Sequence, residues 1–256
     1  MFTQPKLIIF DLDNTLYAFD ALWQEANKAT FESYEQFKGM DYDEFLPLYQ
    51  KYDQHFWKQH DSGLISLDEL RQLRLIETLK RYEIDVTYEE AQAYFERFLS
   101  LLLSKITVNE KMNALLNDLK AHVEIAILTN GKLTEQRTKI ENLQLNTIFN
   151  DNIFISEVMG VEKPDAQAFL KVTDELNIRP EETLMVGDSW TNDVKGSINV
   201  GMSVIWFNPS QTEDRHLDNH QIQIFTGEIE QLLEKLISMM EADCHFRTFD
   251  SYNVRS

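Results

Sequence analysis

The sequence predicts an α/β protein with a doubly wound parallel sheet, interrupted by an all-helical insert. Over most of the chain, short apolar runs alternate with helical patterns, which is the arrangement of βαβ units. Between residues 17 and 105 the pattern is helix after helix, and this stretch holds only two of the eight glycines and one of the five prolines. At 256 residues, the chain has room for a core of about 150 residues and a second module of about 100.

Five runs have the length and composition of strands that are buried on both faces. They are continuously apolar rather than alternating, as expected for a parallel sheet covered by helices on either side. The expected strands are residues 7–10, 123–128, 153–155, 183–186 and 203–206. Helical patterns lie near residues 109–120, 132–143, 165–177 and 191–200. Residues 207–222 are polar and are expected to form a surface loop, and residues 241–256 show no clear period.

The insert is expected to be a set of helices. Apolar positions recur at helical spacing in residues 20–37, 43–58, 67–82 and 88–104. Ser66 with Glu69 and Thr87 with Glu90 have the spacing of capping boxes, which start helices. The expected domains are an α/β core of residues 1–16 and 106–240, a helical domain of residues 17–105, and a tail of residues 241–256.

Charge and cysteine content exclude several classes of protein. The chain has 24 Lys and Arg against 43 Asp and Glu, a net charge of −19, so it repels nucleic-acid polymers and anionic membranes. A small phosphorylated ligand held by a local cation is still compatible with that charge. Cys244 is the single cysteine and excludes an internal disulfide. No run predicts a signal peptide or a membrane span, so a cytoplasmic location is expected.

Polar residues follow four of the expected strands at their carboxyl ends, which is where open α/β sheets bind ligands. They are Asp11 and Asp13 after the first strand, Thr129 and Asn130 after the second, Lys163 after the third, and Gly187, Asp188 and Asp193 after the fourth. Four separate segments of the chain therefore deliver carboxylates, a hydroxyl and a lysine to one edge of the sheet.

Each of these residues also has a structural interpretation. Asp, Thr and Asn cap helices and form turns where strands end, so Thr129 and Asn130 alone would indicate a turn. Lys163 could be an extended residue ahead of a proline. Asp11 and Asp13 are different, because two carboxylates so close together after a buried strand repel each other unless a cation joins them.

Taken together, these groups suit phosphoryl transfer through an aspartyl-phosphate. Asp11 can attack phosphorus in line, which divides hydrolysis into two easier steps. Asp13 can give a proton to the leaving oxygen and later take one from water. Mg²⁺ is the expected cofactor, held by Asp11 and Asp188, because two anions must approach each other. Thr129, the amides that follow it and Lys163 can stabilise charge on the transferring oxygens.

The same segments resemble, in order, the four motifs of the haloacid dehalogenase superfamily. The motifs are Asp11-Leu12-Asp13-Asn14-Thr15-Leu16, Leu128-Thr129-Asn130-Gly131, Lys163-Pro164 and Gly187-Asp188-Ser189-Trp190-Thr191-Asn192-Asp193. The resemblance covers residues 6 to about 209. It implies a Rossmann-like core and a helical cap, which the insert would supply. Because the dehalogenases proper lack the second aspartate, Asp13 points to the phosphatases.

The resemblance also implies a role for each motif residue. Asp11 would be the nucleophile and Asp13 the general acid and base. Phosphate would be bound by Thr129, Asn130 and Lys163, and Mg²⁺ by Asp11, Asp188 and the backbone carbonyl of Asp13. Thr15, Gly187 and Asp193 would support the site.

A narrower likeness is to the bacterial 5′-nucleotidases of this superfamily. It rests on residues 17–20, Phe56-Trp57 ahead of residues 63–65, residues 155–157 before Gly160, and residues 206–209. It implies a nucleoside monophosphate as the small phosphorylated substrate, with Phe19, Trp23 and Trp57 lining its pocket. The alternative for these aromatic residues is packing inside the insert.

Other functions stay open from sequence alone. The enzyme could be a phosphatase or phosphomutase acting on a sugar phosphate or another small phosphorylated metabolite. A receiver-like phosphoacceptor switch also combines a parallel sheet, an aspartate, Mg²⁺ and a lysine, but it lacks a cap and a second aspartate at the position of Asp13. A non-catalytic ligand-binding relative is the third alternative. The sequence predicts no particular oligomeric state.

Overall fold

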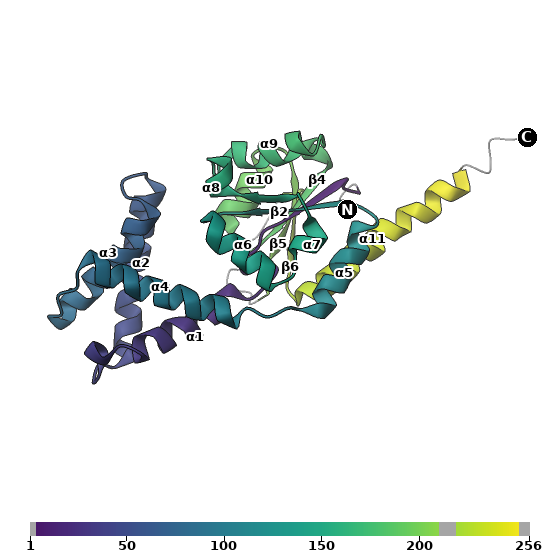
Figure 1. The fold of residues 1–256 in the computed structure, drawn as a ribbon. Helices are drawn as coiled ribbons and strands as arrows, with labels where there is room; N and C mark the ends of the chain where they lie inside the picture. The colour runs from purple at the N-terminus through teal and green to yellow at the C-terminus, as the bar shows by residue number, and fades with distance from the viewer. Residues whose placement is uncertain (1–3, 210–218, 251–256) are drawn as a thin grey trace, which may run out of the picture. The chain divides into compact units, whose positions relative to one another are not determined.

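The chain divides into two compact units in the computed structural model (Figure 1). The structure describes residues 4–209 and 219–250, without the side chains of Asp61 and residues 243–250. One unit is Met1–Phe19 with Thr107–Ser256, and the other is Asp20–Ile106. The insert expected from the sequence, residues 17–105, thus differs from the second unit by three residues at its start and one at its end.

The first unit is built on a six-stranded sheet in which every pair of neighbouring strands is parallel. The strands are β1 (Leu7–Phe10), β2 (Glu124–Thr129), β3 (Ile153–Ile155), β4 (Thr183–Gly187), β5 (Ser203–Phe207) and β6 (Ile222–Phe225). Their order is β3-β2-β1-β4-β5-β6, so β1 lies in the middle, between β2 and β4. The predicted α/β fold is confirmed.

One strand was not expected from the sequence. Strand β6 pairs with β5 and begins at Ile222, the last residue of the stretch assigned to a surface loop. That assignment is wrong at Ile222 and also at Phe207, the last residue of β5, and residues 210–218 of the stretch lie outside the described residues. The strand is at an edge of the sheet, with Gln223 and Ile224 exposed, so it lacks the continuous apolar run of the strands inside the sheet.

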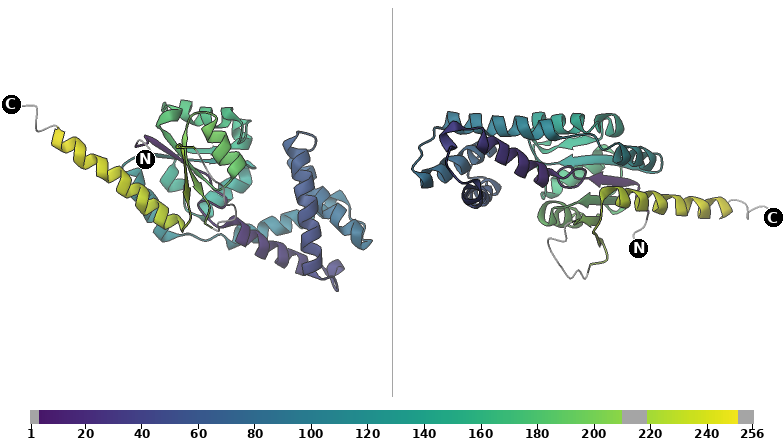
Figure 2. Two further views of the ribbon diagram at one scale, coloured as in Figure 1. Left: turned by 180° about the vertical axis from the view of Figure 1, so that it is seen from behind. Right: turned by 90° about the horizontal axis from the view of Figure 1, so that it is seen from below.

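Helices cover both faces of the sheet (Figure 1). They are α5 (Glu110–Lys120), α6 (Leu133–Asn142), α7 (Asn146–Phe149), α8 (Ser156–Met159), α9 (Ala166–Glu175), η3 (Pro180–Glu182), η4 (Trp190–Lys195), α10 (Gly196–Ile198) and α11 (Ile229–Asp250). Helix α9 packs Phe169 and Val172 against alternate strand residues such as Met185. Phe10 points to the opposite face and contacts Phe149 of α7. Figure 2 shows from behind that α11, in yellow, lies on the other side of the sheet from α9 and α10.

Helix α11 includes part of the stretch for which the sequence predicted no structure. It continues to Asp250, while residues 251–256 and the side chain of Cys244 lie outside the described residues. Its first half is held to the unit by buried side chains, among them Leu233 and Leu236, and Asn109 donates a hydrogen bond of 2.7 Å to Glu230. Across the described part of the chain, we find no helix with the length and apolar character needed to cross a bilayer.

The second unit consists of helices packed around an aromatic core. They are α1 (Phe19–Glu32), η1 (Glu35–Phe37), α2 (Tyr42–Asp61), α3 (Leu67–Leu79), η2 (Lys80–Tyr82) and α4 (Tyr88–Lys105). Both predicted capping boxes are confirmed: Ser66 starts α3 with Glu69, and Thr87 starts α4 with Glu90. In each box, the hydroxyl accepts from a backbone amide and the glutamate accepts from the cap residue, which pairs two amides that a helix start otherwise leaves unpaired.

Candidate active site

The carboxyl ends of the three central strands lie side by side and bring the motif residues together. Strand β1 is fully buried, and its ladder to β4 continues one residue further through a 2.9 Å hydrogen bond from the Asp11 amide to the Val186 carbonyl. Asp188 comes directly after β4, and Asp193 lies in η4, the turn of π-helix that follows. Strand order alone therefore places these aspartates at one edge of the sheet.

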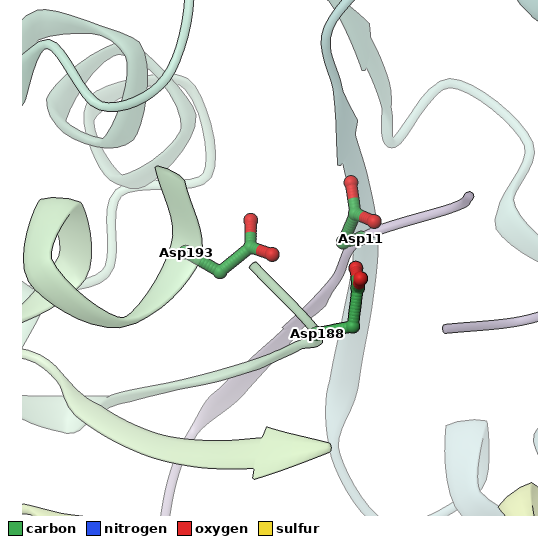
Figure 3. Close-up of side chains that lie close together, drawn as sticks. All are labelled: Asp11, Asp188 and Asp193. Carbon is green, nitrogen blue, oxygen red and sulfur yellow. The ribbon is translucent and has the colours of Figure 1, made fainter. Parts of the chain in front are cut away.

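Three carboxylates converge there (Figure 3). Asp11, Asp188 and Asp193 each have an oxygen within 4.8 Å of the others. Asp11 is 7% exposed and Asp193 is fully buried. The buried Lys163 donates from Nζ to Asp11 Oδ1 and to Asp193 Oδ1, both at 2.6 Å. Lys163 thus joins the third motif to the first and the fourth.

Gly187 is required where it stands because Asp193 packs against it. A Cβ atom on Gly187 would lie 2.4 Å from the Asp193 side chain, far closer than non-bonded atoms approach. Asp193 Oδ2 accepts from the Ser189 amide at 2.9 Å, so both of its oxygens are hydrogen-bonded within the protein. Trp206 Nε1 donates to the Asp188 carbonyl at 2.8 Å and so holds the loop between Gly187 and Asp193. Asp193 is therefore placed to support Lys163.

Crowding of the carboxylates changes their acidity. Burial raises the pKa of Asp11 to about 7, although Lys163 opposes the change, and Asp193 raises it further. Burial, then the charges of Asp11 and Asp193, raises the pKa of Asp188 to about 8. Burial lowers the pKa of Lys163, but the two ion pairs outweigh it and the pKa lies above its ordinary value. Lys163 is therefore charged, and one lysine cannot balance the three carboxylates once all of them are ionised.

This imbalance fits a divalent cation. Burial and neighbouring carboxylates oppose the ionisation of Asp11 and Asp188, and a divalent cation beside them would favour their charged forms. Mg²⁺ is bound in proteins by one or two carboxylates together with water and substrate oxygens, and these two aspartates offer that donor set. The contribution of the Asp13 carbonyl stays a prediction.

The second motif forms a loop that holds Lys163. Thr129 is buried at the end of β2. The Asn130 side chain accepts a hydrogen bond from the Lys163 amide at 2.9 Å and donates one to the Lys163 carbonyl at 2.8 Å. These two bonds hold the backbone of Lys163 in place. Gly131 has a φ of 136° and donates its amide to Ser156 Oγ at 2.9 Å. The side chain of Asn130 thus positions Lys163, and its predicted contact with phosphate stays a prediction.

Asp13 lies apart from the carboxylate cluster and has its own partners. Lys139 Nζ donates to both of its oxygens at 2.8 Å, and Gln136 Nε2 donates to Oδ2 at 3.2 Å. The Tyr17 hydroxyl donates to Oδ1, and burial, followed by the charge of Asp13, raises the pKa of Tyr17. Asp13 is therefore held by three donors from two segments of the chain.

Sequence reasoning missed Lys139 and Gln136 as residues of the site and assigned no role to Tyr17. Lys139 and Gln136 are three residues apart in a helix that was expected, so a shared face was visible in the sequence. The burial of this face against Asp13 was not visible in the sequence, because Lys139 and Asp13 are 126 residues apart.

The remaining predicted residues are more dispersed. Thr15 is buried, and its hydroxyl has no hydrogen-bond partner among the residues described. The Phe19 ring lies 4.7 Å from Lys139 Nζ, beside Asp13. Trp23 packs against Tyr49 and Phe98 inside the helical unit, with ring centroids 6.2 and 5.9 Å away. Trp57 is 41% exposed and contacts His60 on the same helix. For Trp23 these contacts match the alternative of packing within the insert.

Comparison with known proteins agrees with the motifs. Residues 5–201 match the family of haloacid dehalogenase-like hydrolases. A glyceraldehyde 3-phosphate phosphatase of Pyrococcus furiosus is 30% identical over 90% of this chain and 92% of its own length. The pyrimidine 5′-nucleotidase PynA of Streptococcus pneumoniae is 28% identical over 84% of this chain and 86% of its own. The magnesium-bound structure of the HAD-hydrolase YfnB of Bacillus subtilis has a TM-score of 0.76 and 25% identity, covering 91% of this chain and 99% of that one.

The match extends over most of the sheet-forming unit and across the insert. The chain therefore belongs to the haloacid dehalogenase-like hydrolases. Within that family it is a hydrolase of phosphoric monoesters, as its four motifs and the named phosphatases among its relatives indicate.

Proposed function

We propose that the protein hydrolyses nucleoside monophosphates through an aspartyl-phosphate on Asp11, with Mg²⁺ as cofactor. The observation that carries the proposal is the buried Lys163, which contacts Asp11 and Asp193 at 2.6 Å beside the carboxylate of Asp188. Phosphoryl transfer requires a nucleophilic carboxylate, a positively charged side chain fixed beside it, and a group of carboxylates that can bind a metal ion.

Asp11 is the nucleophile in this proposal. Lys163 binds Oδ1 and so orients the carboxylate, while Oδ2 attacks phosphorus and the bond to the leaving oxygen breaks. The Lys163 ammonium and the Thr129 hydroxyl then face the charge that spreads over the transferring oxygens. When Mg²⁺ is bound by Asp11, Asp188 and the Asp13 carbonyl, it supplies the positive charge that lets two anions meet.

Asp13 carries the proton in both steps. As an acid it protonates the leaving alcohol while the phosphoryl group moves to Asp11. As a base it then takes a proton from the water that attacks the aspartyl-phosphate, which releases inorganic phosphate and restores Asp11. This second carboxylate distinguishes a hydrolase from a stable phosphoacceptor switch. The helical unit, Asp20–Ile106, serves as the cap in this proposal, and the cytoplasm is the proposed location.

The substrate class has two candidates. Two relatives, PynA and the Escherichia coli protein YjjG, are pyrimidine 5′-nucleotidases at 28% identity, and they support a nucleoside monophosphate. The glyceraldehyde 3-phosphate phosphatase, at 30% identity over 90% of the chain, supports a small sugar phosphate as the second candidate.

Phosphate release from a panel of monoesters tests the proposal. The panel contains pyrimidine and purine nucleoside monophosphates, triose and pentose phosphates, and p-nitrophenyl phosphate, each with Mg²⁺ or with EDTA. We expect hydrolysis with Mg²⁺, highest for a nucleoside monophosphate, and none with Asp11→Asn. Asp174→Asn, an exposed position on α9, is the matched control and should keep full activity.

Each part of the proposal can fail separately. Preference for a sugar phosphate would replace the nucleotide and keep the mechanism. Hydrolysis by Asp11→Asn would refute the nucleophile. A phosphoryl group that stays on Asp11 without turnover would indicate the switch.

A further inference from the structure

Helix α6 carries two polar side chains that are buried deep in the sheet-forming unit. Gln136 is 1% exposed and Lys139 is 5% exposed, and they lie one helical turn apart on the same face. A buried amide or ammonium group costs free energy unless it is paired, so the partners of these two side chains indicate what the burial serves.

Their partners are the groups that the proposed chemistry uses. Lys139 Nζ lies 2.8 Å from each oxygen of Asp13. Gln136 Nε2 lies 3.2 Å from Asp13 Oδ2 and 2.5 Å from Thr129 Oγ1. One helix face therefore contacts both the proton carrier after β1 and the phosphate-binding threonine after β2.

The contacts leave Asp13 little freedom of orientation. A cation equidistant from both carboxylate oxygens fixes the direction of the group, and Gln136 fixes which oxygen lies toward Thr129. The Lys139 ammonium also lies over the ring of Phe19, 4.7 Å from its centroid, which is a favourable cation–π contact. The Tyr17 hydroxyl also donates to Asp13 Oδ1, but of the three donors only Gln136 joins Asp13 to the phosphate-binding threonine.

We infer that Gln136 and Lys139 are positioning residues for proton transfer by Asp13. This inference rests on the proposed function, and it adds that the aspartate after the nucleophile needs the α6 face to act. In this role both residues act through Asp13 rather than on the substrate itself. They act because proton transfer depends steeply on the placement of the donor, and a displacement of about 1 Å can cost about 10²-fold in rate.

The two steps of the reaction separate this role from a purely structural one. Release of p-nitrophenolate from p-nitrophenyl phosphate needs no proton, because the leaving group is stable as an anion. Release of an alcohol from an alkyl phosphate needs Asp13 as an acid, and hydrolysis of the aspartyl-phosphate needs it as a base for either substrate. A misplaced Asp13 must therefore slow the last two processes and spare the first.

Rapid-mixing kinetics of Lys139→Met on p-nitrophenyl phosphate and on an alkyl phosphate test the inference. We expect the first p-nitrophenolate to appear as a burst at the wild-type rate, followed by steady-state turnover slowed by about 10²-fold. With the alkyl phosphate, the first release of alcohol should slow by a similar factor. Gln136→Leu should show the same pattern more weakly, and Lys139→Arg should recover much of the lost rate. Arg137→Met, an exposed neighbour on α6, is the control.

The outcomes that overturn the inference are distinct. Wild-type steady-state rates in both Lys139→Met and Gln136→Leu would remove any positioning role. Equal slowing of p-nitrophenolate release and of the later steps would show that α6 supports the whole site rather than Asp13. Should Lys139→Met fail to fold, Gln136→Leu and Lys139→Arg decide the matter. Hydrolysis by the wild type that is lost in Asp11→Asn shows that the proposed function holds even where this inference fails, whereas an inactive wild type would overturn both.

Discussion

Mg²⁺ should stabilise this protein much more at pH 8 than at pH 5. The reason is that burial, and after it the charges of neighbouring carboxylates, raise the pKa of Asp11 to about 7 and that of Asp188 to about 8 in the folded protein without metal. In the unfolded chain these groups ionise near 3.8. Between these values the unfolded chain releases protons that the folded protein keeps, so the metal-free protein loses stability as the pH rises through this window.

The size of the effect follows from Asp11. Each pH unit between its folded and unfolded pKa values is worth about 1.4 kcal/mol, so full ionisation of Asp11 costs on the order of 4 kcal/mol. About 3 kcal/mol of this cost falls between pH 5 and pH 7. A bound divalent cation offsets it, because it neutralises the carboxylates without a proton. For a domain of this size the difference corresponds to about 6–12 °C in Tm.

Thermal unfolding followed by circular dichroism at pH 5 and pH 8, with EDTA or with saturating Mg²⁺, measures this difference. We expect a small rise in Tm with Mg²⁺ at pH 5 and a large one at pH 8. Asp188→Asn should remove most of the rise at pH 8, because it removes one ligand and one of the repelling charges. Asp174→Asn, away from the cluster, should behave as the wild type.

Two results would refute the reasoning. An equal rise in Tm at both pH values would show that the bound cation does not compete with protons on Asp11 and Asp188. No rise at either pH would show that the three carboxylates do not form a cation site.

Two further substitutions test the support of the site and of the helical unit. Asn130→Ala removes two hydrogen bonds to the Lys163 backbone, each worth about 1 kcal/mol, and should lower kcat/KM for phosphate release by about tenfold or more; an unchanged kcat/KM would mean that Lys163 keeps its place without Asn130. Ser66→Ala breaks the capping box of α3 and should lower the free energy of unfolding by about 1 kcal/mol in urea titrations, with phosphate release unaffected. Ser238→Ala, at an exposed serine of α11, is its control, and equal stability of the two variants would contradict the cap's contribution.

Local features of the fold could be predicted well because they depend on neighbouring residues. The strands β1 and β3 have the predicted bounds, and the two capping boxes form where their three-residue spacing places them. Strand β6 was missed because an edge strand needs no continuous apolar run, and its pairing with β5 is decided by the sheet. No local sequence pattern marks the residues at which the long helix α11 begins and ends.

The site shows the same division. That Asp11, Lys163 and Asp188 would meet could be inferred, because parallel strands of a doubly wound sheet end at one edge. The contacts that hold these side chains in place could not be inferred from the sequence. The contact of Asn130 with phosphate stays a prediction, and no sequence pattern indicates that its side chain holds the backbone of Lys163, 33 residues away.

By itself, the sequence determined the α/β class, the helical insert, the four motifs and the phosphatase chemistry that they suit, since each depends on residue type and short spacing. Tertiary structure alone decided that Lys139 and Gln136 face Asp13, that Asp193 supports Lys163, and that Trp23 packs within the helical unit. The physical reason is that a charged or polar side chain takes whichever partner the packing of helices and strands places beside it. That choice is made over tens to hundreds of residues, and it is what sets the acidity and orientation of the groups that react.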